Sequence, residues 1–276
     1  MDHAQHARSI DKDTTLCISL AARPSNFGTR FHNYLYNALE LNYVYKAFTT
    51  SDLRAAIGGV RGLGIRGCAI SMPFKEDVIE LVDVMHDSAA AIDSVNTVVN
   101  DAGELHAYNT DYQAVANLLR DNAVPTELSF ALAGSGGMAK AVVAAVRDAG
   151  FTDGTVVARN EAAGRALADK YGFRYAPTLD HAPGFLLNAT PVGMDGDAAD
   201  AMPFTEDAVR AATTVLDVVA KPPTTPLIRL ATQLNKSVIT GADVIALQAA
   251  EQFVLYTGVH PTPEQISRAS EYASAG

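Results

Sequence analysis

The stretch that decides the fold is residues 128–143, Leu-Ser-Phe-Ala-Leu-Ala-Gly-Ser-Gly-Gly-Met-Ala-Lys-Ala-Val-Val. An apolar run comes first, a glycine-rich segment follows, and apolar residues at helical spacing complete it, which predicts a strand, a tight turn and a helix. Glycines let the backbone approach a ligand closely, and the N–H groups that open a helix favour an anion. The stretch therefore predicts a Rossmann-type dinucleotide-binding unit. The residues expected to contact the cofactor are Gly134, Ser135, Gly136, Gly137 and Met138.

One arginine suggests which dinucleotide is bound. Residues 154–158 predict the next strand, and Arg159 ends it at about the 20-residue spacing where such units read the adenine-side ribose. An acid there would accept hydrogen bonds from a free 2′-OH, whereas an arginine pairs with a 2′-phosphate, so NADP is the expected cofactor. Glu161 is an alternative ribose contact, although the dipole of the predicted helix also explains an acid there. An ordinary glycine turn remains the alternative for the whole motif.

Composition narrows the classes of partner. The 276 residues, 48% of them hydrophobic and 19% charged, suffice for two domains with packed cores. A net charge of −10 argues against a nucleic-acid or anionic-membrane partner, while a small anionic ligand remains compatible. We expect no nucleic-acid partner and no membrane association. A homodimer is compatible with the sequence, which does not specify an oligomeric state.

The cysteines and the N-terminal segment indicate the compartment. Cys17 and Cys68 lie in apolar runs and are expected to be buried free thiols in a reducing environment. Residues 1–13 are polar and lack the apolar core of a signal peptide, and no apolar run reaches membrane-spanning length. The sequence therefore predicts a cytoplasmic protein. The seven histidines show no paired helical spacing and no Cys-x-x-Cys occurs, so no metal site is predicted.

The order of predicted elements indicates a two-domain α/β protein. Strands are predicted near 14–20, 43–48 and 67–72, followed by a hairpin over 95–108, with helices over 31–41 and from 50 onward. A helix over 111–122 leads into strand–helix repeats over 126–238, and helices over 244–256 and 263–273 close the chain. The prediction is a substrate domain, with a mostly parallel sheet, of residues 1–110 plus 240–276, and a Rossmann domain of residues 111–239.

Four polar residues are candidates for chemistry, each with a structural alternative. Lys75 follows an apolar strand, at the sheet edge where ligands bind, or it is a solvated lysine at a helix start. Asp111 is either a site residue or the cap of its helix. Asn96, amid valines, is either a satisfied structural amide or a ligand contact. Gln248, taken alone, is typical of a helix surface.

With these residues in view, the chain resembles the shikimate dehydrogenase family over nearly its whole length. The stretches that carry the resemblance are Phe31-His32-Asn33, Ser71-Met-Pro-Phe-Lys75, Val95-Asn-Thr-Val98, Tyr108-Asn-Thr-Asp111, 134–141, Asn188-Ala-Thr190-Pro-Val-Gly193-Met194, Thr225-Pro-Leu227, Gly241 and Gln248-Ala-Ala-Glu-Gln252-Phe253. The resemblance implies NADP-linked interconversion of shikimate and 3-dehydroshikimate, a cyclic hydroxy acid and its ketone, in aromatic amino-acid biosynthesis on the chorismate pathway.

The resemblance also implies residue roles. It makes Lys75 and Asp111 a catalytic pair, and it gives Asn96 and Gln248 to the ring hydroxyls of the substrate. Ser71 stands where most members carry a threonine and is expected on the substrate side. The remaining residues expected at the cofactor are Thr190 and Gly241.

The chain departs from the family at the end of the site that holds the substrate carboxylate. Two serines of the family are replaced by Asn26 and Gly28, and a tyrosine is replaced by Ala220. The candidate replacements are Ser25, Asn26, Thr29 and Arg23. Guanidinium binds carboxylate with two parallel hydrogen bonds, and the alternative for Arg23 is a solvated loop arginine. The residues flanking Arg159 also differ, so the chain resembles a divergent branch. Quinate or another ring acid as substrate, a low-activity NADP-binding sensor, and a folate-interconverting dehydrogenase are the alternatives.

Overall fold

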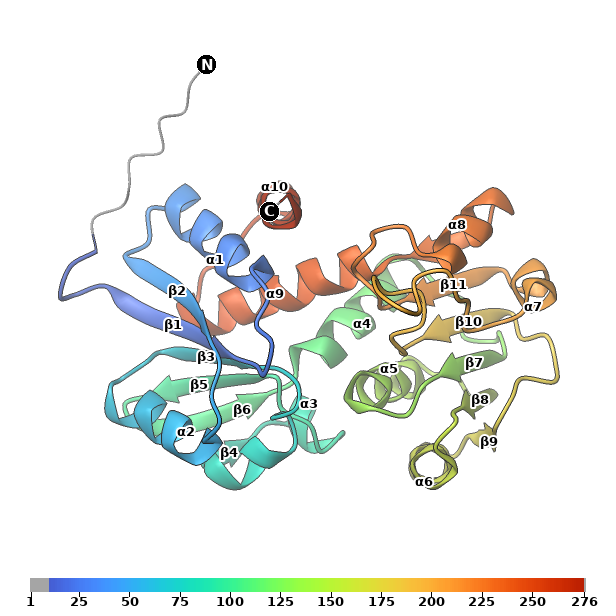
Figure 1. The fold of residues 1–276 in the computed structure, drawn as a ribbon, viewed down its shortest axis with the longest axis horizontal. Helices are drawn as coiled ribbons and strands as arrows, with labels where there is room; N and C mark the ends of the chain where they lie inside the picture. The colour runs from blue at the N-terminus through green and yellow to red at the C-terminus, as the bar shows by residue number, and fades with distance from the viewer. Residues whose placement is uncertain (1–9, 276) are drawn as a thin grey trace, which may run out of the picture. The chain divides into compact units, whose positions relative to one another are not determined.

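The computed structural model describes residues 10–275 (Figure 1). Its contacts divide them into two compact units. Unit 1 holds residues 10–89, 95–108 and 249–275, and unit 2 holds Ala90–Ser94 and Asn109–Gln248. These bounds differ from the predicted 1–110 plus 240–276 and 111–239. The observed boundary at 248/249 falls inside α9 (Gly241–Thr257), so the first residues of this helix count with unit 2, and Ile92 packs in the core of unit 2.

The sheet of unit 1 has six strands in the order β2-β1-β3-β5-β6-β4. The strands are β1 (Thr15–Leu20), β2 (Tyr43–Phe48), β3 (Gly67–Ile70), β4 (Val84–Met85), β5 (Thr97–Asp101) and β6 (Glu104–Tyr108). β1 pairs in parallel with β2 and β3, whereas β5 pairs antiparallel with β3 and β6. The predicted hairpin is confirmed, and Ala102 (φ 51°) and Gly103 (φ 99°) form its turn.

Within residues 10–275, five helices belong to unit 1 besides the C-terminal half of α9. They are α1 (Phe27–Ala38), α2 (Leu53–Gly62), the short 3₁₀ helix η1 (Asp77–Leu81), α3 (Asp87–Ala90) and α10 (Pro263–Ser274). Asn33 joins α1 to β2, since its Nδ2 donates to Tyr45 O (2.8 Å) and its Oδ1 accepts from Tyr45 N (3.0 Å). α10 packs against α1, where Arg30 donates to Tyr272 O at 2.7 Å (Figure 1). Cys17 and Cys68 are buried free thiols, as predicted.

The sheet of unit 2 has six parallel strands in the order β12-β11-β10-β7-β8-β9. The strands are β7 (Phe130–Ala133), β8 (Gly154–Val157), β9 (Arg174–Ala176), β10 (Phe185–Asn188), β11 (Thr214–Asp217) and β12 (Ser237–Ile239). The helices are α4 (Thr110–Asp121), α5 (Gly137–Asp148), α6 (Glu161–Tyr171), α7 (Glu206–Ala211) and α8 (Pro226–Gln233). Counted within the unit, the strand order is 3-2-1-4-5-6 reversed, that of the Rossmann fold, so the predicted α/β class is confirmed.

The packing of α5 in the core of unit 2 and the order of its strands set the position of the glycine-rich turn. Residues Ala141–Val146 of α5 are all buried, so this helix lies tightly packed in the core. Strand order reverses between β7 and β10, and ligands of open α/β sheets bind at such a switch point, beyond the carboxyl ends of the strands. The turn between β7 and α5 stands at that edge. Across residues 10–275, no helix is both long and apolar enough to cross a membrane.

Candidate functional site

The turn between β7 and α5 has the geometry of an anion cradle. Gly134 has φ +122°, and a Cβ there would lie 3.0 Å from the carbonyl oxygen of Ala189, so this position requires glycine. Gly136 is extended, and a Cβ on it would meet nothing within 4 Å. The space in front of the helix is therefore open where a side chain would otherwise fill it.

The N-terminus of α5 is not capped by a side chain, unlike those of its neighbours. Side-chain oxygens cap α4, α6, α7 and α8, the capping residues being Asn109, Asn160, Thr205 and Thr225. At α5 the N-cap residue is Gly136, which has no side chain to accept a hydrogen bond. The first-turn N–H groups of α5 can therefore bind a phosphate, and the turn fits a dinucleotide. Ser135 is half-buried in the turn, and Met138 packs on the core.

Arg159 follows β8 and is exposed. Among residues 10–275 its guanidinium makes no hydrogen bond or ion pair. Glu161, the alternative ribose contact, accepts from Arg165 at 2.8 Å one helical turn away. Asn160 caps α6 by accepting from Ala163 N at 3.1 Å. The arginine is thus the residue at the end of β8 that is available to an anionic ligand.

Thr190 belongs to a buried network that the sequence analysis missed. Its Oγ1 donates to Asn188 Oδ1 (2.6 Å), and Asn188 Nδ2 donates to Asp217 Oδ1 (2.9 Å). Thr225 Oγ1 donates to the other oxygen of Asp217 at 2.7 Å. Burial raises the pKa of the Asp217 carboxyl, and these hydrogen bonds oppose that shift. The network ties the ends of β10 and β11 together. The signal for this network in the sequence was the polar residue that ends each apolar strand, Asn188 in β10 and Asp217 in β11.

Close packing explains why residue 241 is a glycine, which the sequence motif alone did not indicate. A Cβ on this first residue of α9 would lie 2.2 Å from the carbonyl oxygen of Val219. The backbones of α9 and the segment after β11 therefore approach too closely for any side chain. The cofactor role expected for Gly241 stays a prediction.

In unit 1, Lys75 lies half-buried in the turn after β3. The 3₁₀ helix begins only at Asp77, so the interpretation of Lys75 as a helix-start lysine is wrong. Its carbonyl oxygen accepts from Val95 N at 2.8 Å, which fastens the turn to the segment before β5. Ser71, the expected substrate residue, is exposed at the start of the same turn, where its carbonyl oxygen accepts from Phe74 N.

Asn96 is held firmly at the entrance to β5. It is 3% exposed, and its Oδ1 accepts from Thr97 Oγ1 at 2.8 Å. Gln252 on α9, which sequence reasoning passed over, donates to Thr97 Oγ1 (2.9 Å) and to the carbonyl oxygen of Asn96 (3.2 Å). Only tertiary packing brings this glutamine to the strand. Gln252 thus holds the backbone at Asn96 and the Thr97 side chain in place.

Asp111 lies in unit 2, in the first turn of α4, and is 8% exposed. The interpretation of Asp111 as the helix cap is wrong, because Asn109 accepts the capping hydrogen bond from Tyr112 N (3.1 Å). Beside it, Gln248 Nε2 donates to Thr110 Oγ1 at 3.2 Å. The structure thus brings Gln248 to the start of α4, where it bonds the residue that precedes Asp111.

The end of unit 1 where the family serines are replaced is polar but sparsely bonded. Asn26 precedes α1 and makes no side-chain capping hydrogen bond. A Cβ on Gly28 would meet the Tyr45 ring at 3.5 Å, an ordinary contact. Arg23 is exposed and, within the described chain, forms no hydrogen bond or ion pair. No group of three or more His, Cys, Asp or Glu side chains in residues 10–275 is arranged to hold a metal ion.

Comparisons with known proteins agree with this arrangement. Residues 26–98 match the family model described as the shikimate dehydrogenase substrate binding domain. The chain is 50% identical over 266 residues to a shikimate dehydrogenase-like protein of Haemophilus influenzae, covering 96% of this chain and 98% of that protein.

Solved structures extend the likeness to the fold. Shikimate 5-dehydrogenase of Thermus thermophilus, in complex with NADP(H) and shikimate, is 29% identical with a TM-score of 0.85, covering 94% of this chain and 99% of that one. Quinate dehydrogenase of Corynebacterium glutamicum, in complex with NAD, is 25% identical with a TM-score of 0.86, covering 95% and 99%. The resemblance inferred from the motifs is confirmed, and the chain belongs to the shikimate dehydrogenase family.

Proposed function

We propose that this chain is an NADP-dependent oxidoreductase that interconverts shikimate and 3-dehydroshikimate in aromatic amino-acid biosynthesis. The observation that carries the proposal is the open, uncapped glycine turn of the Rossmann sheet, together with the available Arg159 at the end of β8. The Thermus thermophilus relative, in complex with NADP(H) and shikimate, supports this choice of ligands. Cytoplasmic location accords with the buried free thiols of Cys17 and Cys68.

On the cofactor side, the proposed roles follow from charge. The N–H groups at the start of α5 bind the pyrophosphate, and Gly136 leaves the space for it. The Arg159 guanidinium binds the 2′-phosphate, a group that NAD lacks. NADP, when bound, supplies a nicotinamide ring that accepts or returns a hydride.

On the substrate side, Lys75 is the proposed group that takes the hydroxyl proton as the carbon loses hydride, and returns it in the reverse direction. Asp111 is the second proposed catalytic residue. Asn96 and Gln248 are proposed to orient ring hydroxyls, and Ser71 is proposed on the same substrate side. The hydrogen bond from Thr97 Oγ1 orients the Asn96 amide, and Gln252 holds the backbone carbonyl of Asn96, which lowers the entropy cost of orienting a ring.

The test is initial rates with shikimate and with quinate, each with NADP and with NAD. Lys75→Ala should lower kcat with shikimate by about 100-fold or more, the usual contribution of general acid–base catalysis. NADPH binding, followed by fluorescence, should stay unchanged. Lys12→Ala removes an exposed lysine paired with Asp13 and serves as the control. Wild-type turnover by Lys75→Ala would remove Lys75 from the reaction.

A second candidate is favoured by the replaced carboxylate contacts. With Asn26, Gly28 and Ala220 in place of hydroxyl-bearing residues, quinate or another cyclic hydroxy acid is the alternative substrate, and the quinate dehydrogenase relative has the same fold. Tight NADPH binding without turnover of any ring acid would instead indicate a sensor. Size-exclusion chromatography of the same samples tests for a homodimer.

A further inference from the structure

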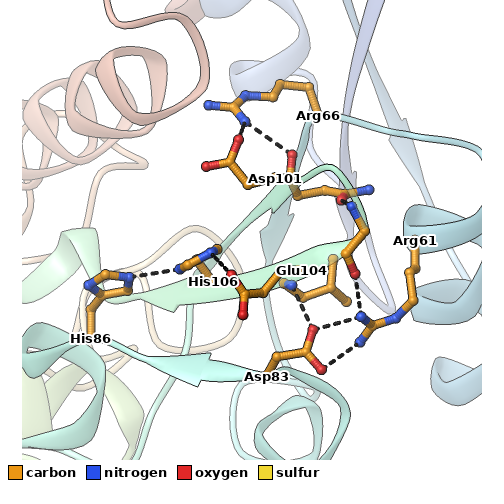
Figure 2. A network of polar contacts seen from close by, with 10 residues as sticks. Arg61, Arg66, Asp83, His86, Asp101, Glu104 and His106 are labelled. Carbon is orange, nitrogen blue, oxygen red and sulfur yellow. Dashed lines mark hydrogen bonds and ion pairs between the residues drawn. The ribbon is translucent and has the colours of Figure 1, made fainter.

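Two histidines that are distant in sequence meet at the edge of the unit 1 sheet (Figure 2). His86 follows β4 and His106 lies on β6, and the parallel pairing of these strands brings them together. His86 Nε2 is 3.2 Å from His106 Nδ1. Imidazole nitrogens bound to one tetrahedral zinc ion at its usual bond length lie about 3.3 Å apart. The two nitrogens are hydrogen-bonded, and a shared metal ion needs nearly the same separation, with both rings turned slightly so that the ion lies to one side of the line joining them.

A carboxylate sets the orientation of the second ring. Glu104 Oε2 is 3.1 Å from His106 Nε2, on the side of the ring away from His86 (Figure 2). Because a carboxylate only accepts, it favours a proton on Nε2 and leaves the Nδ1 lone pair directed at His86. A carboxylate on the outer nitrogen is the arrangement that orients metal-binding histidines in proteins.

Packing fixes the His86 ring. The charged side chains close to the two histidines carry a net negative charge. The His86 ring stacks on Tyr108, with centroids 4.1 Å apart and planes at 12°. The backbone N–H of His86 donates to Ala107 O at 3.0 Å. Exposed Asp87 is the next residue, while Asp83 is neutralised by Arg61 at 2.6 Å. Glu104 and Asp87 therefore leave a local field that favours a cation.

We propose that His86 Nε2 and His106 Nδ1 bind a Zn²⁺ ion, with Glu104 as the carboxylate that orients His106. Water completes the coordination, since only two protein ligands converge. Without the ion the two rings share one N–H···N hydrogen bond. Zinc takes both lone pairs, and the proton of that bond shifts to the far nitrogen of His86, so both imidazoles remain neutral. The two histidines are 20 residues apart, so no local spacing in the sequence indicates that they meet.

The test is isothermal titration of the full-length chain, without a histidine tag, with ZnCl₂. His3 and His6 lie outside the described residues, so the background protein carries His3→Gln and His6→Gln. The expected result is one zinc ion per chain. His86→Phe keeps a ring to stack on Tyr108 and should weaken binding about tenfold or more, and Glu104→Gln about tenfold. His181→Gln is the matched control, because His181 contacts a carboxylate, Asp180, at 3.1 Å as His106 does.

Thermal unfolding gives a second measurement that does not depend on turnover. Zinc should raise the melting temperature of the background protein and raise that of His86→Phe much less at the same zinc concentration, because a ligand that binds the folded state stabilises it in proportion to the logarithm of its occupancy. His106→Gln repeats the test should His86→Phe fold poorly by circular dichroism. Absence of zinc binding, or equal binding by the background protein and both histidine variants, would overturn the proposal.

Discussion

At the scale of one residue, removing the Arg159 guanidinium tests whether it selects NADP over NAD. Charge-assisted hydrogen bonds contribute about 1.5–3 kcal/mol, so Arg159→Ala should raise KM for NADPH about 10- to 100-fold and leave KM for NADH nearly unchanged. Steady-state kinetics with both cofactors measures this. Arg229→Ala removes another exposed arginine, on α8, and is the control. An equal loss with both cofactors would mean that Arg159 does not touch the 2′-phosphate.

His32 makes the stability of the protein depend on pH. It is fully buried, and its ring stacks on Tyr45 with centroids 4.4 Å apart. Burial lowers the pKa of His32 to about 3, which the nearby Gln252 amide weakly opposes. The buried His32 ring therefore stays neutral in the folded state, whereas in the unfolded chain it binds a proton below about pH 6.5. The free energy of unfolding is therefore not reduced by His32 above about pH 6.5, and it falls progressively as the pH drops from there toward 3.

The expected loss from His32 is about 2 kcal/mol of unfolding free energy between pH 7 and pH 5. His32→Phe keeps an aromatic ring in the cluster and should remove this part of the pH dependence. Urea unfolding of both proteins at the two pH values measures it, with His260→Gln, an exposed histidine, as control. The same pH slope in His32→Phe and in the wild type would assign the effect to other groups.

At the scale of the element, substitutions in the turn between β7 and α5 distinguish residues needed for stability from residues needed for NADPH binding. The backbone of Gly136 suits any residue, so Gly136→Val should cost no more than about 1 kcal/mol of stability. Its branched side chain would occupy the open space before α5 and should abolish NADPH binding. Fluorescence titration and urea unfolding measure the two effects. Wild-type affinity in Gly136→Val would place the pyrophosphate elsewhere.

Gly134→Ala is the comparison within the same turn. Its positive φ and the 3.0 Å approach to Ala189 O predict a loss of about 1–3 kcal/mol of stability, unlike Gly136→Val. Each glycine of this motif thus has its own physical reason. One permits the backbone path, and the other leaves room for a ligand.

At the scale of the whole molecule, NADPH should stabilise unit 2 directly. A ligand at 100 times its dissociation constant adds about 2.7 kcal/mol of stability to the state that binds it. Amide hydrogen exchange should therefore slow most in the β7–α5 turn and around Arg159, with little change in α2 of unit 1. Equal slowing in α2 would argue against a cofactor site confined to the Rossmann unit.

The sequence by itself determined most elements and their order. Apolar periodicity and turn residues are local signals, and they predicted the β7–α5 turn, the hairpin of β5 and β6, and the closing helices α9 and α10. The structural alternative for Lys75 was a solvated lysine at a helix start, and that for Asp111 was a helix cap. Both interpretations failed because neighbouring residues, Asp77 and Asn109, start and cap those helices instead.

Only the tertiary structure decided which distant residues meet. Strand pairing joins His86 to His106, α9 brings Gln252 to Asn96, and the ends of β10 and β11 assemble Asn188 with Asp217. These partners lie too far apart in the chain for any local pattern to report them. Their contacts form because burying apolar faces sets the strand order, and the buried polar groups must then find partners among the residues that this order makes neighbours.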